Sequence, residues 1–334
     1  MVKYKPEEIT YELFGIDPVS FYENKYALGE SHSNYLANPV FHYELGYECF
    51  RRMIGDLKAL LPLGGKVLDL GCGSGIYGPT VLANVSNIEL YGIDMSETCL
   101  AQALANGYSQ CKLHNLSQPI PYDDEYFEAV FSMDLFGHIE FRHKDFLIEE
   151  AYRVTKGRGV GHHGIETGFI DYFNCDPLNE NNPIRKYVLL HGHIGTEPAK
   201  AVCQRFSKYF DEVKHQVTYL YPYFADKDYF ANQFEEEFAR LVKQHNHPES
   251  RQLFLIIMGR LNRYFIDQYS RVFGKAFQPY DSPPKKLDKK HEKANKKMLK
   301  LLEDYNRKFG IDFVPTPREL FRPGGYSSLT VKKF

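Results

Sequence analysis

A strand-like apolar run that leads directly into three closely spaced glycines constrains this chain more than any other feature of its sequence. Residues 66–70 have the apolar character of a buried strand, and residues 77–85 have that of a helix. Between them lie Gly71, Gly73 and Gly75. Because glycine lacks a Cβ atom, the backbone there bends sharply and approaches a ligand closely, and the first N–H groups of the following helix are available to a carboxylate. The segment therefore predicts an anion-binding turn at the end of a strand.

Strand and helix patterns alternate through the first half of the chain. Helices are expected at residues 39–61, 96–106 and 146–154, between apolar runs that have the length of strands. Strands that alternate with helices of this length predict a parallel α/β sheet with right-handed crossovers. The expected strands span residues 66–70, 88–93, 111–116, 129–133 and 160–165.

Residues 67–75 resemble the first motif of the class I S-adenosylmethionine-dependent methyltransferases, with Asp69 two positions before the first glycine. Two more segments strengthen the resemblance. Residues 119–133 are similar to the family's run into its fourth strand, and residues 153–159 are similar to the turn before its fifth. The likeness is close over residues 64–166 and implies a methyltransferase that uses S-adenosyl-L-methionine as its cofactor.

The same turn also fits a second class of nucleotide-binding protein. Residues 73–78 match the GxGxxG pattern of dinucleotide-binding folds, and Asp94 follows at a suitable distance. A nicotinamide-dependent oxidoreductase is therefore an alternative, although the three methyltransferase-like segments together favour the methyltransferase. Two residues depart from that family: Asn115 stands where many members have Asp, and Arg158 stands in a turn that usually reads Pro-Gly-Gly.

The resemblance implies a cofactor site at the carboxyl ends of the strands. Asp69 and the glycine turn would lie at the methionine end of the cofactor. Asp94 would bind the ribose, where an acceptor-only carboxylate suits two donating hydroxyls. Met95 would face the adenine, and Asn115 with Leu116 would bind its edge. The full expected set is Asp69, Gly71, Cys72, Gly73, Gly75, Asp94, Met95, Asn115, Leu116 and Met133.

The rest of the chain is expected to complete a Rossmann-like sheet. By the same resemblance, residues 213–224 form a sixth parallel strand and residues 327–331 a seventh, antiparallel one, with helices on both faces of the sheet. Residues 226–323 are then a helical insertion between these two strands. The expected units are an N-terminal lid segment (residues 1–38, with Tyr22, Tyr26, His32 and Tyr35), a methyltransferase domain (residues 39–225 plus 324–334) and the insertion (residues 226–323).

Two histidines and an acid near the ends of the fourth and fifth strands are the candidate catalytic residues. His138 follows the fourth strand and is a candidate general base, against the plainer interpretation of a loop histidine that bonds to backbone. His163 and Glu166 lie at the end of the fifth strand, where alternation places them on opposite faces. No metal site is expected, because the His and Cys residues lack the spacing typical of zinc ligands.

Composition and charge bear on the acceptor. The 334 residues are 43% hydrophobic and 25% charged, as in ordinary globular proteins, but include 25 Phe and 25 Tyr without any Trp. Part of this aromatic excess gathers at residues 219–238, which are expected either to belong to the core or to form a wall of an acceptor pocket. A large insertion that excludes water and shapes a pocket favours a small polar metabolite or a sugar-like molecule, methylated at O or N.

Two alternatives to a small-molecule methyltransferase stay open. Residues 281–309 hold ten Lys and Arg against five Asp and Glu, which would suit RNA as the acceptor. The net charge of −2 and the absence of a recognisable RNA-binding module argue against nucleic acid. The other alternative is a non-catalytic binding module on the same fold.

The apolar segments of the sequence bear on the cellular location of the protein and on its oligomeric state. The N-terminus lacks the apolar core of a signal peptide, and the longest run of large apolar residues, 253–258, is too short to span a bilayer. The six cysteines are scattered, as expected for reduced thiols. We therefore expect a cytoplasmic protein without a membrane span. Residues 253–257 are apolar on all sides, which indicates the centre of a helical bundle or a homodimer interface.

Overall fold

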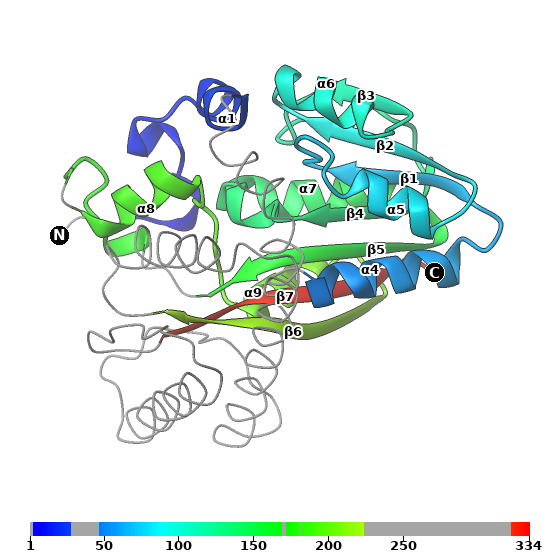
Figure 1. Ribbon diagram of the computed structural model, residues 1–334. Helices are drawn as coiled ribbons and strands as arrows, with labels where there is room; N and C mark the ends of the chain where they lie inside the picture. Colours follow the sequence, from blue (N-terminus) through cyan, green and yellow to red (C-terminus); the bar gives the residue numbers. More distant parts are fainter. Residues whose placement is uncertain (1–2, 28–46, 169–171, 181, 224–321) are drawn as a thin grey trace, which may run out of the picture.

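The computed structural model describes residues 3–27, 47–168, 172–180, 182–223 and 322–334 (Figure 1). In this described part, seven strands form one sheet in the order β3-β2-β1-β4-β5-β7-β6. Strand β7 runs antiparallel to its neighbours β5 and β6, and the other pairs are parallel, which confirms the predicted fold class. The strands are β1 (Gly65–Leu70), β2 (Ile88–Asp94), β3 (Gln110–Leu113), β4 (Phe127–Met133), β5 (Thr155–Thr167), β6 (Glu212–Tyr223) and β7 (Arg322–Lys332).

Where the strand boundaries differ from the prediction, the difference has a local cause. Strand β3 ends at Leu113, so Asn115 and Leu116 lie in the loop beyond it rather than in the strand. Strand β5 already begins at Thr155, so the turn expected over residues 156–159 belongs to an irregular stretch of strand. Arg158 has a positive φ of 66° there, and the register between β4 and β5 shifts at this point.

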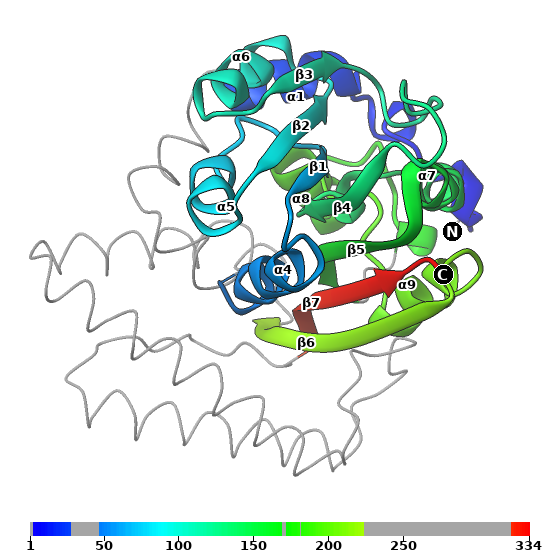
Figure 2. The same cartoon turned by 90° about the vertical axis from the view of Figure 1, so that its right-hand side faces the viewer.

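Helices cover both faces of the sheet (Figure 2). The alternation of β1 explains the two layers: Val67 packs into the cluster of helices α4, α5 and α6, and Leu68 and Leu70 pack into the cluster of helices α7 and α9. Helix α4 buries Met53 and Leu57, which are almost fully inaccessible, against the sheet. The helices are α4 (Tyr47–Leu60), α5 (Gly78–Asn84), α6 (Glu97–Ala105), α7 (Phe141–Val154) and α9 (Ala199–Phe206).

Strands β6 and β7 pair along their whole length, although 98 residues separate them in sequence. Tyr223 at the end of β6 pairs with Arg322 at the start of β7, so the chain leaves the sheet and returns to it at the same place. The predicted helical insertion, with its basic helix and aromatic segment, falls almost entirely on residues 224–321, which lie outside the described residues. Residues 322–323 belong to β7 and so to the sheet.

The N-terminal residues pack beyond the carboxyl ends of the strands. Helix α1 (Pro18–Ala27) and helix α8 (Pro183–His191) lie on the side toward which the parallel strands point (Figure 1). A small hydrophobic cluster that includes Ile9, Phe14 and Val188 packs the N-terminal residues against helix α8. Helix α1 also contacts α6, where Glu23 accepts hydrogen bonds from the backbone N–H and the hydroxyl of Thr98. The first described residues therefore close over the edge of the sheet where the expected site lies.

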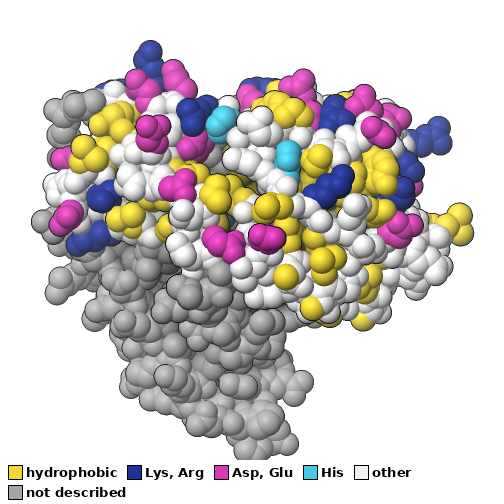
Figure 3. All heavy atoms as spheres, turned by 90° about the horizontal axis from the view of Figure 1, so that it is seen from above, with side chains coloured by type: hydrophobic (Ala, Val, Ile, Leu, Met, Phe, Trp, Pro, Cys, Tyr) yellow, Lys and Arg dark blue, Asp and Glu magenta, His cyan; other side chains and the backbone are white. Residues whose placement is uncertain are grey.

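Acidic and basic side chains are interspersed on the face seen from above in Figure 3, and hydrophobic side chains lie among them. No part of this visible face carries a continuous field of one charge sign. In the described ranges, no helix is both long and apolar enough to cross a membrane.

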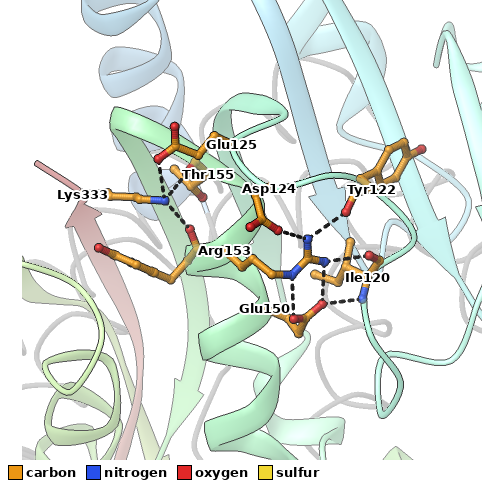
Figure 4. A network of polar contacts seen from close by, with 9 residues as sticks. Ile120, Tyr122, Asp124, Glu125, Glu150, Arg153, Thr155 and Lys333 are labelled. Carbon is orange, nitrogen blue, oxygen red and sulfur yellow. Dashed lines mark hydrogen bonds and ion pairs between the residues drawn. The ribbon is translucent and has the colours of Figure 1, made fainter.

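Arg153 near the end of α7 fixes the segment that leads into β4 (Figure 4). Its guanidinium donates to the carbonyl oxygens of Ile120 and Tyr122, both at 2.9 Å, and to the carboxylates of Asp124 and Glu150. Glu150 in turn accepts from the backbone N–H of Ile120 at 2.7 Å. This network gives a physical reason for the arginine in the segment that resembles the family's fifth-strand turn.

Candidate functional site

The glycine turn that follows β1 is hydrogen-bonded to the end of β2. The backbone N–H groups of Gly71 and Cys72 both donate to the carbonyl oxygen of Ile93, at 2.8 and 3.0 Å. Gly71, like Gly73 and Gly75, has a positive φ, where an L side chain is strained. A Cβ atom on Gly75 would also lie only 2.8 Å from the Cα of Ala103. The turn therefore requires glycine for both conformation and space, as the sequence predicted.

Asp94 joins this turn to the start of α6. Its Oδ2 accepts from the N–H of Gly73, and its Oδ1 accepts from the N–H of Ser96, both at 2.9 Å. Burial raises the pKa of Asp94, and the backbone N–H groups counteract part of that rise. Each carboxylate oxygen keeps acceptor capacity beyond these bonds, so the group is able to accept from further hydroxyls.

Asp69 lies beneath the turn and not on its surface. Its side chain is 2% exposed, and its Oδ2 accepts from the hydroxyl of Tyr108 at 2.7 Å. Burial raises the pKa of Asp69 well above its ordinary value. Direct contact of Asp69 with the cofactor stays a prediction, and the observed bond shows that Asp69 supports the turn through Tyr108.

Tyr108 is a site residue that the sequence did not reveal. Its ring packs against the positions where Gly75 and Gly78 lack side chains, since a Cβ on either would lie 2.6 Å from Tyr108 Cε2. Tyr108 follows α6 and is 4% exposed, so it forms the floor under the turn. Because these glycines have no side chains, they leave space for the ring of Tyr108. Nothing in the sequence, however, links the glycines to a tyrosine that lies 33 residues after Gly75.

The remaining expected cofactor residues gather at the same edge of the sheet. Met95 follows β2 and is half-buried, while Leu116 and Met133 are buried. Asn115 is exposed, and its Oδ1 accepts from the N–H of Ser117 at 2.9 Å. Cys72 lies within the turn with its thiol buried. Their roles toward a cofactor stay predictions, but the fold brings all of them to the ends of β1 to β4.

His138 lies in a hydrogen-bonded cluster with two tyrosines from the N-terminal segment. It ends the short 3-10 helix η3 (Phe136–His138) that follows β4. Its Nδ1 is 2.8 Å from the hydroxyl of Tyr22 and 3.2 Å from the carbonyl oxygen of Gly192. The Tyr22 hydroxyl is 2.6 Å from the hydroxyl of Tyr11, which donates to Gly192 O at 2.7 Å. Three distant segments of the chain therefore meet at this histidine.

These contacts are consistent with one arrangement of protons. Since a carbonyl oxygen only accepts, Tyr11 O–H donates to Gly192 O, Tyr22 O–H donates to the Tyr11 oxygen, and the Tyr22 oxygen accepts from His138 Nδ1–H. With the opposite tautomer of His138, Tyr22 would donate to Nδ1 and Tyr11 to Tyr22, which would leave the contacts of the Tyr11 hydroxyl with Gly192 O (2.7 Å) and His138 O (2.8 Å) both without a proton. The first arrangement keeps one of these carbonyl bonds, and it places the ring proton of neutral His138 on Nδ1 and the lone pair on Nε2.

Glu166 joins the same cluster through a second histidine. Its Oε2 is 2.6 Å from Nδ1 of His193, and the His193 ring packs edge-on against the His138 ring with 4.3 Å between centroids. Residues from the ends of β4 and β5 and from the loop after α8 are thereby brought together. Tyr11 and His193 are further members of the cluster that the expected site set did not include, because they come from segments outside the motifs.

His163 lies elsewhere, in the core on the α7 and α9 side of the sheet. Its ring is 0% exposed, contacts Phe136 and Phe206, and accepts or donates one bond at 2.9 Å between Nδ1 and the Ser132 hydroxyl. Alternation had placed it on the face opposite Glu166, but the helices that cover that face shut out any acceptor. This position speaks against the expected catalytic role of His163.

The burial of His163 predicts an acid sensitivity of the fold. Burial lowers its pKa to about 3, whereas an unfolded histidine titrates near 6.5. As the pH falls, this histidine is protonated in the unfolded chain before it is protonated in the folded chain. The free energy of unfolding is therefore unaffected by this group above about pH 6.5 and decreases between pH 6.5 and pH 3. Roughly 2 kcal/mol of the free energy of unfolding should disappear between pH 6 and pH 4 through this group.

Urea unfolding of the wild-type chain and of His163→Gln at these two pH values measures the effect. The variant, whose amide does not titrate, should lose roughly 2 kcal/mol less than the wild type over the same interval. Equal losses in the two proteins would contradict a neutral, buried imidazole.

Part of the chain is similar to a known protein family, and the chain is also similar to solved structures. Residues 67–159 match the family model described as a methyltransferase domain, and no curated protein sequence matches the chain. Among solved structures the chain is similar to Haemonchus contortus phosphoethanolamine N-methyltransferase 2 in complex with S-adenosyl-L-methionine, with 16% identity and a TM-score of 0.45 over 85% of this chain and 52% of that one. It is also similar to a putative methyltransferase from Bacillus halodurans, with 18% identity and a TM-score of 0.43 over 84% of this chain and 98% of that one.

The chain spans only about half the length of the Haemonchus protein. The family match covers residues 67–159, which include the glycine turn bonded to Asp94 and lie within the seven-stranded sheet with its antiparallel β7. The chain therefore contains a methyltransferase domain, and S-adenosyl-L-methionine is the cofactor of that domain.

Proposed function

We propose that this protein transfers the methyl group of S-adenosyl-L-methionine to a small polar acceptor, a metabolite or a sugar-like molecule, at an oxygen or a nitrogen atom. One observation carries the proposal: the cluster of His138, His193 and Glu166 lies at the carboxyl ends of β4 and β5, at the same sheet edge as the turn bonded to Asp94, and Tyr22 of helix α1 contacts it. A proton-accepting group and a carboxylate thus lie where a ligand in an α/β sheet meets the strand ends.

The residues at the turn fit the cofactor. When bound, S-adenosyl-L-methionine supplies an electrophilic methyl group on a sulfonium. The turn at residues 71–75, whose three glycines have positive φ, would lie against the methionine portion of the cofactor. Asp94 would accept from the ribose hydroxyls, Met95 and Leu116 would contact the adenine, and the Asn115 amide would bond to its edge.

The histidine cluster would orient the acceptor and remove its proton. With Nδ1–H held by the Tyr22 oxygen and Gly192 O, His138 presents Nε2 as the basic atom. After proton transfer, the same two oxygens stabilise the charged imidazolium. The Glu166 and His193 pair would bind a donating hydroxyl or amine of the acceptor. In-line displacement depends mainly on such positioning.

The segments around the sheet would exclude water from this reaction. We propose residues 1–38 as a lid and residues 39–225 plus 322–334 as the methyltransferase domain, with residues 226–321 as the insertion that completes the acceptor pocket. The lid is supported by the bonds from α1 to both halves of the site: Tyr22 contacts His138, and Glu23 holds Thr98 just beyond Asp94. A cytoplasmic location and a homodimer stay predictions from the sequence.

Methyl transfer from S-adenosyl-L-methionine with an isotopically labelled methyl group tests the acceptor class. The full chain is incubated with a polar metabolite extract and, separately, with total RNA, and the products are separated by mass. We expect label in a small polar product. Label in RNA alone would contradict the proposal and favour the RNA alternative, and no label in either, despite bound cofactor, would favour a non-catalytic module.

A further inference from the structure

Two cysteines lie on the same face of the sheet, on either side of a glycine beneath the cofactor turn. The side chain of Cys72 covers Gly92 of β2, where an added Cβ would lie 2.7 Å from Cys72 Sγ. On the next strand, Cys111 of β3 pairs directly with Gly92. Paired residues of parallel strands project their side chains to the same face, and Cys72 and Cys111 belong to the same hydrophobic cluster, so only the bare position of Gly92 lies between them.

The two thiols differ in access and in acidity. Of the chain's six cysteines, all within the described residues, only Cys111 and Cys203 are not fully buried. The neighbouring Cys72 thiol lowers the pKa of Cys111, whereas the Cys111 sulfur together with burial raises the pKa of Cys72. Cys111 is thus the accessible and more acidic thiol, and Cys72 is the buried partner beside it.

We propose that Cys72 and Cys111 form a redox-sensitive pair whose oxidation by a hydroperoxide weakens cofactor binding. The Cys111 thiolate attacks the O–O bond of hydrogen peroxide, which gives a sulfenic acid and releases hydroxide. The Cys72 sulfur then attacks the Cys111 sulfur, so that an S–S bond forms, the S–O bond breaks and water leaves. Overall, two thiols lose two electrons and one peroxide becomes two waters.

The position of Cys72 couples this bond to the turn. Its N–H is one of the two that hold the turn on Ile93 O, and its thiol is 3.6 Å from the carbonyl oxygen of Gly73. A disulfide requires the sulfurs to approach to about 2.05 Å, so Cys72 must move toward β3 and carry the turn with it. The turn proposed to contact the methionine portion of the cofactor would then be displaced. This coupling rests on the proposed cofactor site.

Calorimetric titration of the full chain with S-adenosylhomocysteine, before and after hydrogen peroxide treatment, tests the coupling. Oxidation should weaken binding by about tenfold or more, and dithiothreitol should restore it. Peptide mapping without reduction should show Cys72 linked to Cys111. By the reciprocity of linkage, saturating S-adenosylhomocysteine should slow formation of that disulfide.

Two serine variants distinguish oxidation of the Cys72 and Cys111 pair from oxidation of other residues. Cys111→Ser should bind S-adenosylhomocysteine as the reduced wild type does and should be insensitive to peroxide, whereas Cys203→Ser, which alters the other half-exposed thiol, should stay sensitive. Absence of the Cys72 to Cys111 link in the oxidised wild type, or a link that leaves affinity unchanged, would overturn the inference. If the reduced wild type does not bind S-adenosylhomocysteine at all, that result would instead refute the proposed cofactor site.

Discussion

Replacing Asp94 with alanine is expected to weaken binding of S-adenosyl-L-methionine by roughly 100-fold, because the variant loses two charge-assisted hydrogen bonds to the ribose, each worth about 1.5–3 kcal/mol. The change also removes the acceptor of the Gly73 and Ser96 N–H groups, so the turn itself loses an anchor. Equilibrium dialysis with labelled cofactor measures the dissociation constant directly.

A matched control is available on the surface. Asp123 is exposed in the loop before β4, so Asp123→Ala removes the same charge from the chain and should leave the dissociation constant within about twofold of the wild type. Thermal unfolding of both variants shows whether the Asp94 variant stays folded. Binding by folded Asp94→Ala that equals the wild type would contradict the assignment of Asp94 to the ribose.

Replacing His138 with asparagine is expected to lower kcat about 10²–10⁴-fold if the acceptor atom must lose a proton, which is the usual effect of removing a general base. The dissociation constant for S-adenosylhomocysteine should change little, since His138 belongs to the acceptor side of the site. The wild-type rate should fall on the acid side as the imidazole is protonated, and this acid limb should disappear in the variant. Kinetics across pH with the acceptor found by labelling measure both effects.

Two further variants distinguish a base from a structural histidine. Tyr22→Phe removes a hydroxyl that supports Nδ1–H of His138 while keeping the ring. It should lower the pKa seen in the rate profile and move the acid limb to lower pH, because the imidazolium loses an acceptor. His143→Asn changes a histidine of α7 outside the cluster and should leave the profile unaltered. A His138 variant that keeps its rate and its acid limb would show that another group is the base.

The fold was largely predictable because it depends on local patterns that the sequence carries plainly. Short apolar runs between helices specified the parallel strands, and the three glycines specified the turn. Strands β6 and β7 are different: they pair with Tyr223 opposite Arg322 across 98 intervening residues. No periodicity reports such a long-range pairing, and only the resemblance to a known family predicted it.

The site was predictable only in part, since function there depends on contacts between distant segments. Alternation correctly put His163 and Glu166 on opposite faces, but it does not say whether solvent or a helix lies above each face. Glu166 reaches His193 near the strand ends, whereas His163 is enclosed by Phe136 and Phe206. For the same reason the sequence did not reveal Tyr108 under the turn.

The most direct test of the account is the electron density of S-adenosylhomocysteine in a crystal of the full chain. We predict density with the amino acid portion of the ligand against the turn at residues 71–75 and with the ribose hydroxyls on Asp94. The homocysteine sulfur should face the cluster of His138, His193 and Glu166. Ligand density away from the turn, or a ribose that does not contact Asp94, would contradict the account.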